Sequence, residues 1–298
     1  MGDLAQANAG PRGLRELLDG DTLIVAPGAY DALSARLVEQ AGFETVYMTG
    51  YGASASLLGR PDIGLLSFAE MADQARRLVQ AVSVPVIADA DNGYGNALNV
   101  LRAVREYAAA GVAALHIEDQ SVPKRCGHMG GKRVIEQAEM VEKVHAAVDA
   151  RGDSELVLIA RSDARAEEGL ERAIERVASY RDAGADLVFI DALESEREIV
   201  ALGDALPAVA KVINWVEGGR TPLLAPDRLA DLGFRVVLCS LAVLLAATDA
   251  VRVRLERLRD LGSAQPVPAL DFGAFNELIG MAEVAALEAR YASDRRAR

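Results

Sequence analysis

The stretch Val84-Pro85-Val86-Ile87-Ala88-Asp89 is a short apolar run that closes with an acidic residue, and a helical pattern over residues 98–109 follows it. A continuous apolar run without alternation is typical of a parallel strand that is covered on both faces. A strand followed directly by a helix is the repeating unit of α/β folds. The stretch therefore predicts one strand–helix unit of a parallel sheet.

The same unit recurs along the chain. Several of the helical patterns end in an Ala-Gly pair, where glycine supplies the left-handed backbone that closes a helix. The other apolar runs are residues 23–26, 45–48, 114–118, 156–160, 187–190, 211–214 and 236–239, and their helical patterns are residues 31–40, 68–79, 135–150, 169–183, 196–205, 226–232 and 241–258. Eight units within roughly 250 residues predict a (β/α)8 TIM-type barrel, with a doubly wound open sheet as the alternative.

The two ends of the chain fall outside this repeat. We expect residues 1–10 to be disordered and residues 14–18 to form a short helix. Two prolines within residues 265–268 predict a linker, and residues 271–291 predict one amphipathic helix with no obvious place on its own barrel, which favours a homo-oligomer. The expected domains are the barrel, residues 1–262, and the linker with its C-terminal helical arm, residues 263–298.

The bulk composition excludes several classes of function. The net charge of −12, without a basic stripe, argues against nucleic acid and anionic membrane surfaces as partners, but it leaves room for a small anionic substrate. The two cysteines give no disulfide framework, which fits a reducing compartment. No apolar run is long enough to span a bilayer, and residues 1–10 lack the pattern of a signal peptide, so we expect a cytoplasmic protein.

Polar residues gather where the predicted strands end. In a barrel the catalytic residues lie just past the carboxyl ends of the strands, so these side chains are expected to converge on one rim. The sequence therefore predicts an active site there. The residues concerned are Thr49, Gly50, Tyr51, Asp89, Asp91, His116, Glu118, Asp119, Arg161, Asp163, Asp191, Asn214 and Glu217.

Two acids at the end of the third strand suggest a metal site. Asp89 and Asp91 are two residues apart, so on an extended strand both carboxylates point to the same face. Adjacent carboxylates repel unless a cation or a proton lies between them. With Asp62 and Glu118 nearby they form an all-oxygen site that suits Mg²⁺. The alternative is a set of solvated loop acids that cap helices.

Two further strand ends could bind an anionic substrate. Arg161 could clamp a carboxylate with two parallel hydrogen bonds, although an ion pair with Asp163 or Asp191 is the alternative. The backbone N–H groups of residues 49–52 could face an oxyanion, although glycines also mark ordinary turns. His116 lies within a strand and is expected to be structural.

The loop Lys124-Arg125-Cys126-Gly127-His128 follows the fourth strand and places a thiol among cationic side chains. Cationic neighbours favour the thiolate, and an exposed loop lets it react. The alternative is an ordinary cysteine in a basic turn. The other cysteine, Cys239, ends an apolar run and is expected to belong to the core.

Several motifs together resemble the isocitrate lyase/phosphoenolpyruvate mutase superfamily over nearly the whole chain. The Lys-Arg-Cys-Gly-His loop is similar to that of its lyase branch, which includes methylisocitrate lyase, dimethylmalate lyase and the petal death protein. The stretches that carry the resemblance are Thr49-Gly50-Tyr51-Gly52, Gly59-Arg60-Pro61-Asp62, Asp89-Ala90-Asp91-Asn92-Gly93-Tyr94-Gly95, His116-Ile117-Glu118-Asp119-Gln120, Lys124-Arg125-Cys126-Gly127-His128, Ala160-Arg161-Ser162-Asp163-Ala164 and Asn214-Trp215-Val216-Glu217-Gly218-Gly219.

The resemblance implies cleavage of a 2-hydroxy acid between C2 and C3 with Mg²⁺, or else Mn²⁺, as cofactor. The metal would lower the pKa of the substrate hydroxyl. Tyr47 or a metal-linked Glu118 would take the hydroxyl proton, and Cys126, poised by Lys124 and Arg125, would protonate the leaving carbon. The other implied residues are His128 and Asn214 at the leaving carboxylate, Thr49, Gly50, Tyr51, Arg161, Asp191, Glu217 and Thr221 around the rest of the substrate, and Asp62, Asp89, Asp91 and Glu118 at the metal.

Two features of the motifs bear on the substrate. Asp191 stands where methylisocitrate lyases have glutamate, and residues 217–222 are closer to the dimethylmalate lyase type. The resemblance therefore favours a substituted malate over a methylisocitrate-type substrate. Oxaloacetate hydrolysis or decarboxylation, phosphonate chemistry of the phosphoenolpyruvate mutase type and a non-catalytic barrel are the alternatives.

The resemblance also bears on assembly. Members of this superfamily exchange a C-terminal helix between neighbouring barrels. The chain is therefore expected to form a homotetramer, built as a dimer of dimers, through the arm at residues 263–298.

Overall fold

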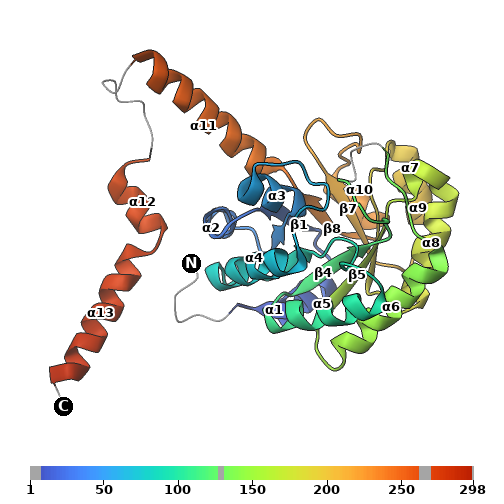
Figure 1. The fold of residues 1–298 in the computed structure, drawn as a ribbon, viewed down its shortest axis with the longest axis horizontal. Coiled ribbons are helices and arrows are strands. Elements are labelled where there is room, and N and C mark those ends of the chain that lie inside the picture. The colour runs from blue at the N-terminus through green and yellow to red at the C-terminus, as the bar shows by residue number, and fades with distance from the viewer. Residues whose placement is uncertain (1–7, 127–130, 262–269, 297–298) are drawn as a thin grey trace.

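A computed structural model describes residues 8–126, 131–261 and 270–296 and shows a closed barrel of eight parallel strands (Figure 1). The ring closes where β1 pairs with β8, with Ile24 opposite Val236. The strands are β1 (Ile24–Ala29), β2 (Val46–Met48), β3 (Val86–Asp89), β4 (Ala114–Glu118), β5 (Val157–Ser162), β6 (Leu187–Ile190), β7 (Lys211–Trp215) and β8 (Phe234–Cys239). This confirms the predicted (β/α)8 fold and excludes the open sheet.

Helices cover the outside of the barrel. The helices that follow β1 to β8 in turn are α2 (Ala32–Gln40), α4 (Phe68–Ala81), α5 (Ala97–Ala109), α6 (Gln137–Arg151), α8 (Leu170–Asp182), α9 (Glu196–Ala205), α10 (Pro226–Asp231) and α11 (Ala242–Leu261). Asp31, Ser67 and Asn96 each close a capping box at the start of α2, α4 and α5. Such caps satisfy N–H groups that a helix start otherwise leaves unpaired. They fix where each helix leaves the rim.

The core has two layers, as the continuous apolar runs predict. Side chains such as Ile87 and Phe189 fill the barrel interior, whereas side chains such as Val86 and Val188 pack between the strands and the helices. All four residues of β3 are buried. Burial on both faces explains why the strands show no polar alternation.

One helix at the rim was not predicted. Residues 49–52 were proposed to present backbone N–H groups, with an ordinary turn as the alternative, but α3 (Gly50–Leu58) begins there, with the Thr49 side chain accepting a hydrogen bond from the N–H of Gly52. Two glycines in its first turn weaken the sequence signal, because glycine is a poor helix former. A short helix, α7 (Arg165–Glu168), also precedes α8.

The N-terminal segment differs in part from the prediction. The short helix is longer than expected, because α1 (Gly10–Asp19) begins at Gly10. The side chain of Asn8 donates hydrogen bonds to the carbonyls of Val82 and Val84 at 2.9 and 2.6 Å. The disorder expected for residues 1–10 is therefore wrong for residues 8–10, and residues 1–7 lie outside the described residues.

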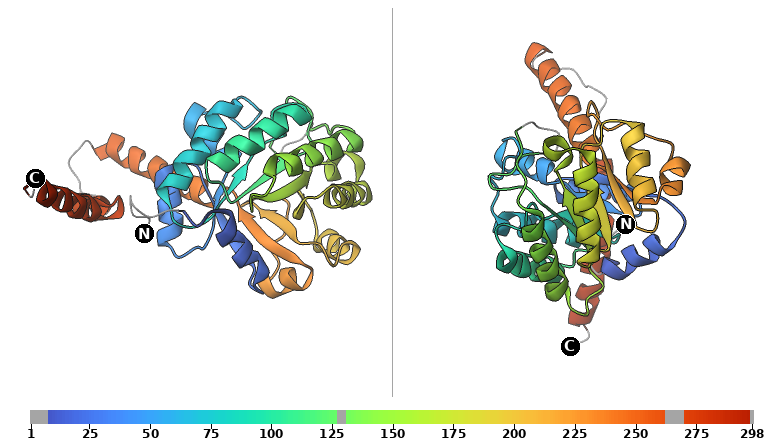
Figure 2. Two further views of the ribbon diagram at one scale, coloured as in Figure 1. Left: turned by 90° about the horizontal axis from the view of Figure 1, so that it is seen from below. Right: turned by 90° about the vertical axis from the view of Figure 1, so that its right-hand side faces the viewer.

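The C-terminal arm consists of two helices rather than one. Gly280, with a left-handed φ of 92°, separates α12 (Phe272–Leu278) from α13 (Met281–Arg296). Figure 1 and the left view of Figure 2 show α11 extending beyond the barrel and α12 and α13 lying to one side of it. The arm nevertheless touches its own barrel, since Gln40 of α2 donates a hydrogen bond to the carbonyl of Leu278 at 3.1 Å. The linker predicted at residues 265–268 lies outside the described residues.

A buried lysine lies at the end of the barrel opposite the rim. Lys211, at the start of β7, is 0% exposed, and its ammonium donates to the carbonyl of Val209 at 2.8 Å. Burial lowers the pKa of Lys211 to about 8. In the unfolded chain the pKa is about 10.4. The unfolded state therefore binds more protons between these values, and the free energy of unfolding rises with pH across that window.

Replacing Lys211 by methionine is expected to raise the free energy of unfolding at pH 7 by on the order of 1 kcal/mol, because the charged group no longer has to be buried. The gain over wild type is expected to shrink as the pH rises towards 10, where the wild-type lysine becomes neutral. Urea unfolding of the wild type and the Lys211→Met variant at pH 7 and pH 10 measures this difference in the free energy of unfolding. A variant that is less stable at pH 7 would refute the prediction.

Among the described residues, no helix combines the length and the apolar character that crossing a membrane requires.

Candidate active site

A cleft of about 410 Å³, part of it open to solvent, lies at the carboxyl ends of the barrel strands. Its position agrees with the rim that the strand ends predict. The predicted site residues that line it are Tyr47, Thr49, Tyr51, Asp62, Asp89, Glu118, Lys124, Cys126, Arg161, Asp191 and Asn214. Gly50 and Asp91 lie next to it, whereas Glu217 and Thr221 of the β7–α10 loop do not line it. His128 lies outside the described residues.

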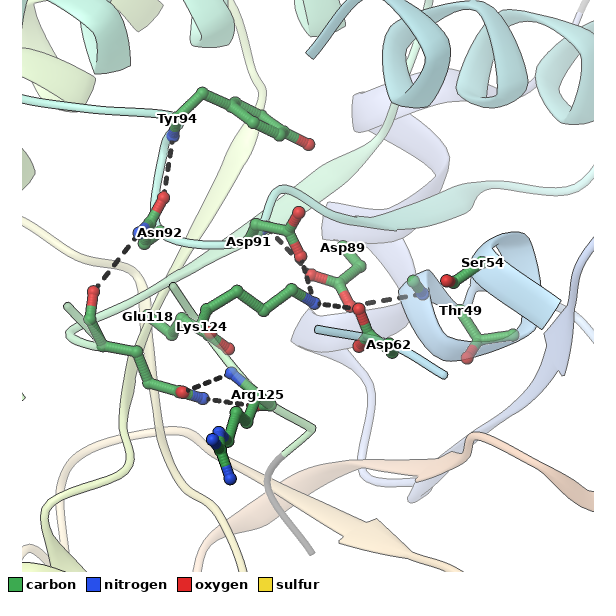
Figure 3. A network of polar contacts seen from close by, with 12 residues as sticks. Thr49, Ser54, Asp62, Asp89, Asp91, Asn92, Tyr94, Glu118, Lys124 and Arg125 are labelled. Carbon is green, nitrogen blue, oxygen red and sulfur yellow. Dashed lines mark hydrogen bonds and ion pairs between the residues drawn. The ribbon is translucent and has the colours of Figure 1, made fainter. Parts of the chain in front are cut away.

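Lys124 bridges two of the predicted metal ligands (Figure 3). Its ammonium lies 2.5 Å from Oδ1 of Asp62 and 2.6 Å from Oδ1 of Asp91. The Asp62 loop is held in turn by the Ser54 hydroxyl, which lies 3.1 Å from the carbonyl oxygens of both Arg60 and Pro61. The role predicted for Lys124 in poising the thiol stays a prediction, and the structure shows Lys124 paired with acids in the same cleft.

Asp89 and Asp91 meet, but not for the reason the sequence suggested. β3 ends at Asp89, and Asp91 follows in a turn with a left-handed φ of 47°. The two residues therefore do not share one face of an extended strand. They are joined because the N–H of Asp91 donates to Oδ1 of Asp89 at 2.9 Å. Left-handed backbone at a non-glycine residue is costly, and it occurs often at functional sites.

Gly50 closes the other side of this acid cluster. Its N–H donates to Oδ2 of Asp89 at 3.2 Å, and a Cβ added at Gly50 would lie 2.4 Å from that oxygen. Any other residue at position 50 would have to displace the Asp89 carboxylate. The backbone N–H that was expected to face a substrate oxyanion is therefore engaged by Asp89 in this structure.

Burial makes two acids of the cleft, Asp91 and Glu118, hard to ionise. Asp62, Asp89, Asp91 and Glu118 are all less than 8% exposed. Burial raises the pKa of Asp91 to about 6, despite the opposing charge of Lys124. Burial likewise raises the pKa of Glu118 well above its ordinary value, despite Arg161. A buried group with a raised pKa in a cleft is a candidate for proton transfer.

The same acids form an environment that suits a hydrated Mg²⁺. Oε1 of Glu118 has no hydrogen-bond partner among the described residues, and the four buried carboxylates outnumber the cations beside them. Within the described part of the chain, no three histidine, cysteine or acidic side chains converge closely enough to hold a metal by themselves. Mg²⁺ usually keeps several waters and takes only one or two carboxylates directly. The residues therefore fit Mg²⁺ with waters, rather than a cage built of protein ligands alone.

Arg161 makes the ion pairs proposed as the alternative and still has capacity for a ligand. Nε and Nη2 donate to Asp163 at 2.8 and 3.1 Å, and Nη2 also donates to Asp191 at 2.8 Å. These bonds leave Nη1 without a hydrogen-bond partner among the described residues, and Arg161 lines the cleft. The two acids fix the guanidinium plane. Arg161 can then offer its remaining nitrogen to a carboxylate.

Tyr47 and His116 form a buried pair under the cleft. The Tyr47 hydroxyl lies 2.9 Å from Nε2 of His116, which is 0% exposed. Burial raises the pKa of Tyr47 well above 10 and lowers the pKa of His116 to about 4, so both groups are neutral at pH 7. This agrees with a structural role for His116. A phenol that resists ionisation is scarcely present in its basic form at pH 7, so Glu118 is the better candidate for that role.

Cys126 reaches the cleft through a loop that is held by its backbone. The N–H of Cys126 donates to the carbonyl of Asp62 at 3.1 Å. The backbone N–H and carbonyl of the neighbouring Arg125 are hydrogen-bonded to the side chain of Gln120. Both Arg125 and Cys126 line the cleft. The other cysteine, Cys239, is partly buried, and burial raises its pKa to about 11. Cys126 lines the cleft, whereas Cys239 does not.

Asn214 is oriented by residues that directly follow β6 and β8. The hydroxyl of Ser240 donates to Oδ1 of Asn214 at 2.5 Å, and Nδ2 of Asn214 donates to Asp191 at 3.4 Å. Ser240, together with Val216 and Leu241, lines the cleft but was not predicted. Ser240 and Leu241 directly follow β8, so extending the strand-end rule to the eighth strand would have found them.

The chain is similar to known proteins over most of its length. Residues 14–259 match the family model described as phosphoenolpyruvate phosphomutase. The chain is 44% identical over 284 residues to a 2,3-dimethylmalate lyase of Eubacterium barkeri, which covers 95% of this chain and 98% of that protein.

The chain belongs to the phosphoenolpyruvate mutase/isocitrate lyase superfamily. It is also 40% identical over 254 residues to a 2-methylisocitrate lyase of Aeropyrum pernix, covering 85% of this chain and 81% of that one. Membership and these lyase relatives identify the chain as an enzyme of the carbon–carbon lyase type.

Solved structures share the fold and differ in chemistry. An oxaloacetate acetylhydrolase in complex with 3,3-difluorooxalacetate superposes with a TM-score of 0.92 at 37% identity, covering 98% of this chain and 99% of that one. A phosphonopyruvate hydrolase in complex with oxalate and Mg²⁺ superposes with a TM-score of 0.80 at 33% identity, covering 95% and 99%. Proteins of this fold catalyse different reactions, so the reaction of this chain has to be inferred from the residues of the cleft.

Proposed function

We propose that this enzyme cleaves a substituted malate of the 2,3-dimethylmalate type between C2 and C3, giving a 2-oxo acid such as pyruvate and a carboxylate. One observation carries the proposal. Oε1 of Glu118 and Nη1 of Arg161, neither of which has a hydrogen-bond partner among the residues that the structure describes, meet the loop that bears Cys126 in one cleft. This cleavage requires a base, a group that binds the substrate anion and an acid that protonates the leaving carbon.

The acid cluster supports Mg²⁺, or Mn²⁺ in its place, as the cofactor. Asp91 would hold it, with Asp62, Asp89 and Glu118 acting directly or through water. When bound, the metal makes the C2 hydroxyl more acidic and neutralises the carboxylate beside it. Lys124 then partly neutralises the negative charge of Asp62 and Asp91.

The chain's own residues can carry the proton transfers. Arg161 binds the C1 carboxylate through Nη1 while Asp163 and Asp191 hold its plane. Glu118 accepts the proton from the C2 hydroxyl, and the C2–O bond becomes a carbonyl as the C2–C3 bond breaks. The electron pair of that bond goes to C3, and the Cys126 thiol gives C3 its proton. Each proton that is removed or added is thus accounted for.

The walls of the cleft favour a small, branched substrate. The cations that line it, Lys124, Arg125 and Arg161, all come from β5 or from the loop after β4. Across the barrel, beyond β7 and β8, the lining includes Val216 and Leu241. Methyl groups would be buried favourably against these side chains, whereas the third carboxylate of a methylisocitrate would meet no cation there.

Oxaloacetate hydrolysis is the second candidate, because the oxaloacetate acetylhydrolase superposes so closely on this chain. Incubating the protein and Mg²⁺ separately with 2,3-dimethylmalate, 2-methylisocitrate and oxaloacetate, and identifying the products, separates the two. Pyruvate from dimethylmalate supports the lyase. Oxalate and acetate from oxaloacetate, with no turnover of either hydroxy acid, would replace it.

We also propose that the enzyme is a homotetramer that uses its C-terminal arm. The arm exposes large apolar side chains, with Phe272 at 81%, Tyr291 at 58% and Met281 at 53% exposure. So many apolar groups on one segment are typical of an interface.

Light scattering at micromolar concentration is expected to give the mass of four chains. Phe272→Glu is expected to shift that mass towards smaller species, because it places a charge in the interface. The matched control is Leu98→Glu on α5, which alters an equally exposed apolar residue outside the arm (75% exposed). A monomer that is fully active at this concentration would rule the proposal out.

A further inference from the structure

Gln120 lies just beyond β4 and is 1% exposed, yet it belongs to none of the predicted site residues. Its side-chain amide makes two hydrogen bonds to a single residue. Oε1 accepts from the N–H of Arg125 at 2.9 Å, and Nε2 donates to the carbonyl of Arg125 at 2.8 Å. A carboxamide can make this two-way contact because it carries both a donor and an acceptor.

Gln120 is itself a fixed point. Its backbone carbonyl accepts from Nδ2 of Asn92 at 3.3 Å, and it pairs in an antiparallel bridge with Val134. The residue therefore ties Arg125 to the end of the barrel strand. Losing the amide would remove two part-buried hydrogen bonds to the backbone of Arg125, which loosens this part of the loop.

The anchor acts on the residue before the thiol. Cys126 follows Arg125 directly, and its own N–H donates to the carbonyl of Asp62. On the other side, Lys124 is held by Asp62 and Asp91. Three successive residues are thus fixed, by a side-chain ion pair, by the Gln120 amide and by a backbone hydrogen bond. The middle one, Arg125, is held at both its N–H and its carbonyl.

We propose that Gln120 is a positioning residue that sets the place of the Cys126 thiol for proton transfer to carbon. The inference rests on the proposed lyase function. Misplacing a reacting group by about 1 Å can cost on the order of a hundredfold in rate. Gln120 does not line the cleft and is expected to act only through the Arg125 backbone.

The test compares Gln120→Leu, which removes both hydrogen bonds, with Gln120→Glu, which keeps only the acceptor. Gln120→Leu is expected to lower kcat for cleavage of 2,3-dimethylmalate by about 10- to 100-fold, with KM within about threefold of wild type. Its kcat is expected to show a larger effect of D2O than the wild type does, because proton transfer becomes slower. Gln120→Glu is expected to fall between the two.

Hydrogen–deuterium exchange reads the anchor without relying on activity. The amide of Arg125 is expected to exchange at least about tenfold faster in Gln120→Leu, because its acceptor is gone. The matched control is Gln74→Leu on α4, since Gln74 is also a buried glutamine that donates to a backbone carbonyl, that of Tyr30. This control is expected to change neither kcat nor the exchange of Arg125.

Each other outcome decides the matter. A Gln120→Leu variant with kcat within twofold of wild type overturns the inference, as does a loss of kcat with unchanged Arg125 exchange. If the wild type cleaves no 2-hydroxy acid, the proposed function fails and the role in proton transfer fails with it. Faster exchange in the variant would then establish Gln120 as a structural anchor alone.

Discussion

Cys126→Ser is expected to lower kcat for C–C cleavage by about 10²–10⁴-fold, which is the range that a positioned general acid contributes. The serine hydroxyl fits the same space but is a far weaker acid than the thiol. The fold and the affinity for Mn²⁺ are expected to stay as in wild type, because serine keeps the backbone N–H that donates to the carbonyl of Asp62.

Initial rates of keto-acid formation from 2,3-dimethylmalate measure this effect. Cys239→Ser is the matched control, since it alters the other cysteine of the chain, and its kcat is expected to stay close to the wild-type value. A Cys126→Ser enzyme that cleaves at the wild-type rate shows that the mechanism is wrong. Loss of cleavage with retained turnover of oxaloacetate would instead favour the hydrolase.

Removing the metal is expected to abolish activity, and Asp89→Ala is expected to do the same. Asp89 accepts hydrogen bonds from Gly50 and Asp91, so its loss unties the turn that presents Asp91 as well as removing one carboxylate. A metal contributes several kcal/mol to the stabilisation of developing charge, so we expect a loss of at least about a thousandfold.

The binding of Mn²⁺, followed by electron paramagnetic resonance, provides a readout that is independent of turnover. Asp89→Ala is expected to bind it at least about tenfold more weakly while its thermal unfolding stays cooperative. Asp73→Ala on α4, which removes an exposed acid paired with Arg76 and Arg77, is the control and is expected to bind Mn²⁺ like the wild type. Full activity after exhaustive treatment with EDTA would eliminate the metal from the account.

Much of the fold could be predicted from the sequence, because each strand–helix unit is a local pattern. Every strand run and its helix lie close to the predicted bounds. The failures are also local. α3 begins with two glycines within its first three residues, and Gly280 divides a continuous amphipathic pattern into α12 and α13.

The candidate site was predicted in its composition rather than in its contacts. The strand-end rule placed Arg161 and Glu118 at one rim, but it could not decide whether Arg161 pairs with acids or binds substrate, and it does the first with Nε and Nη2 while Nη1 stays available. The two-residue spacing of Asp89 and Asp91 suggested a shared strand face, whereas the left-handed turn at Asp91 joins them. Backbone conformation outside regular elements is not visible in residue spacing.

Gln120 belongs to one of the motifs that resemble the superfamily, but it was not predicted as a site residue because a glutamine offers no charge and no nucleophile. Its role depends on a contact with the backbone of Arg125, and a sequence pattern does not show which backbone groups are left to be satisfied. Lys124 is a similar case, since its contact with Asp62 bridges two separate loops.

The most direct test of the central claim is proton NMR of the products formed from 2,3-dimethylmalate with Mg²⁺ in D2O. A C2–C3 lyase gives pyruvate and propionate in equal amounts, and the protonation of the leaving carbon places one deuteron at C2 of each propionate. The account predicts this pair of products from the wild type and not from Cys126→Ser. If the wild type forms no pyruvate from dimethylmalate, while oxaloacetate yields oxalate and acetate, the lyase assignment is contradicted.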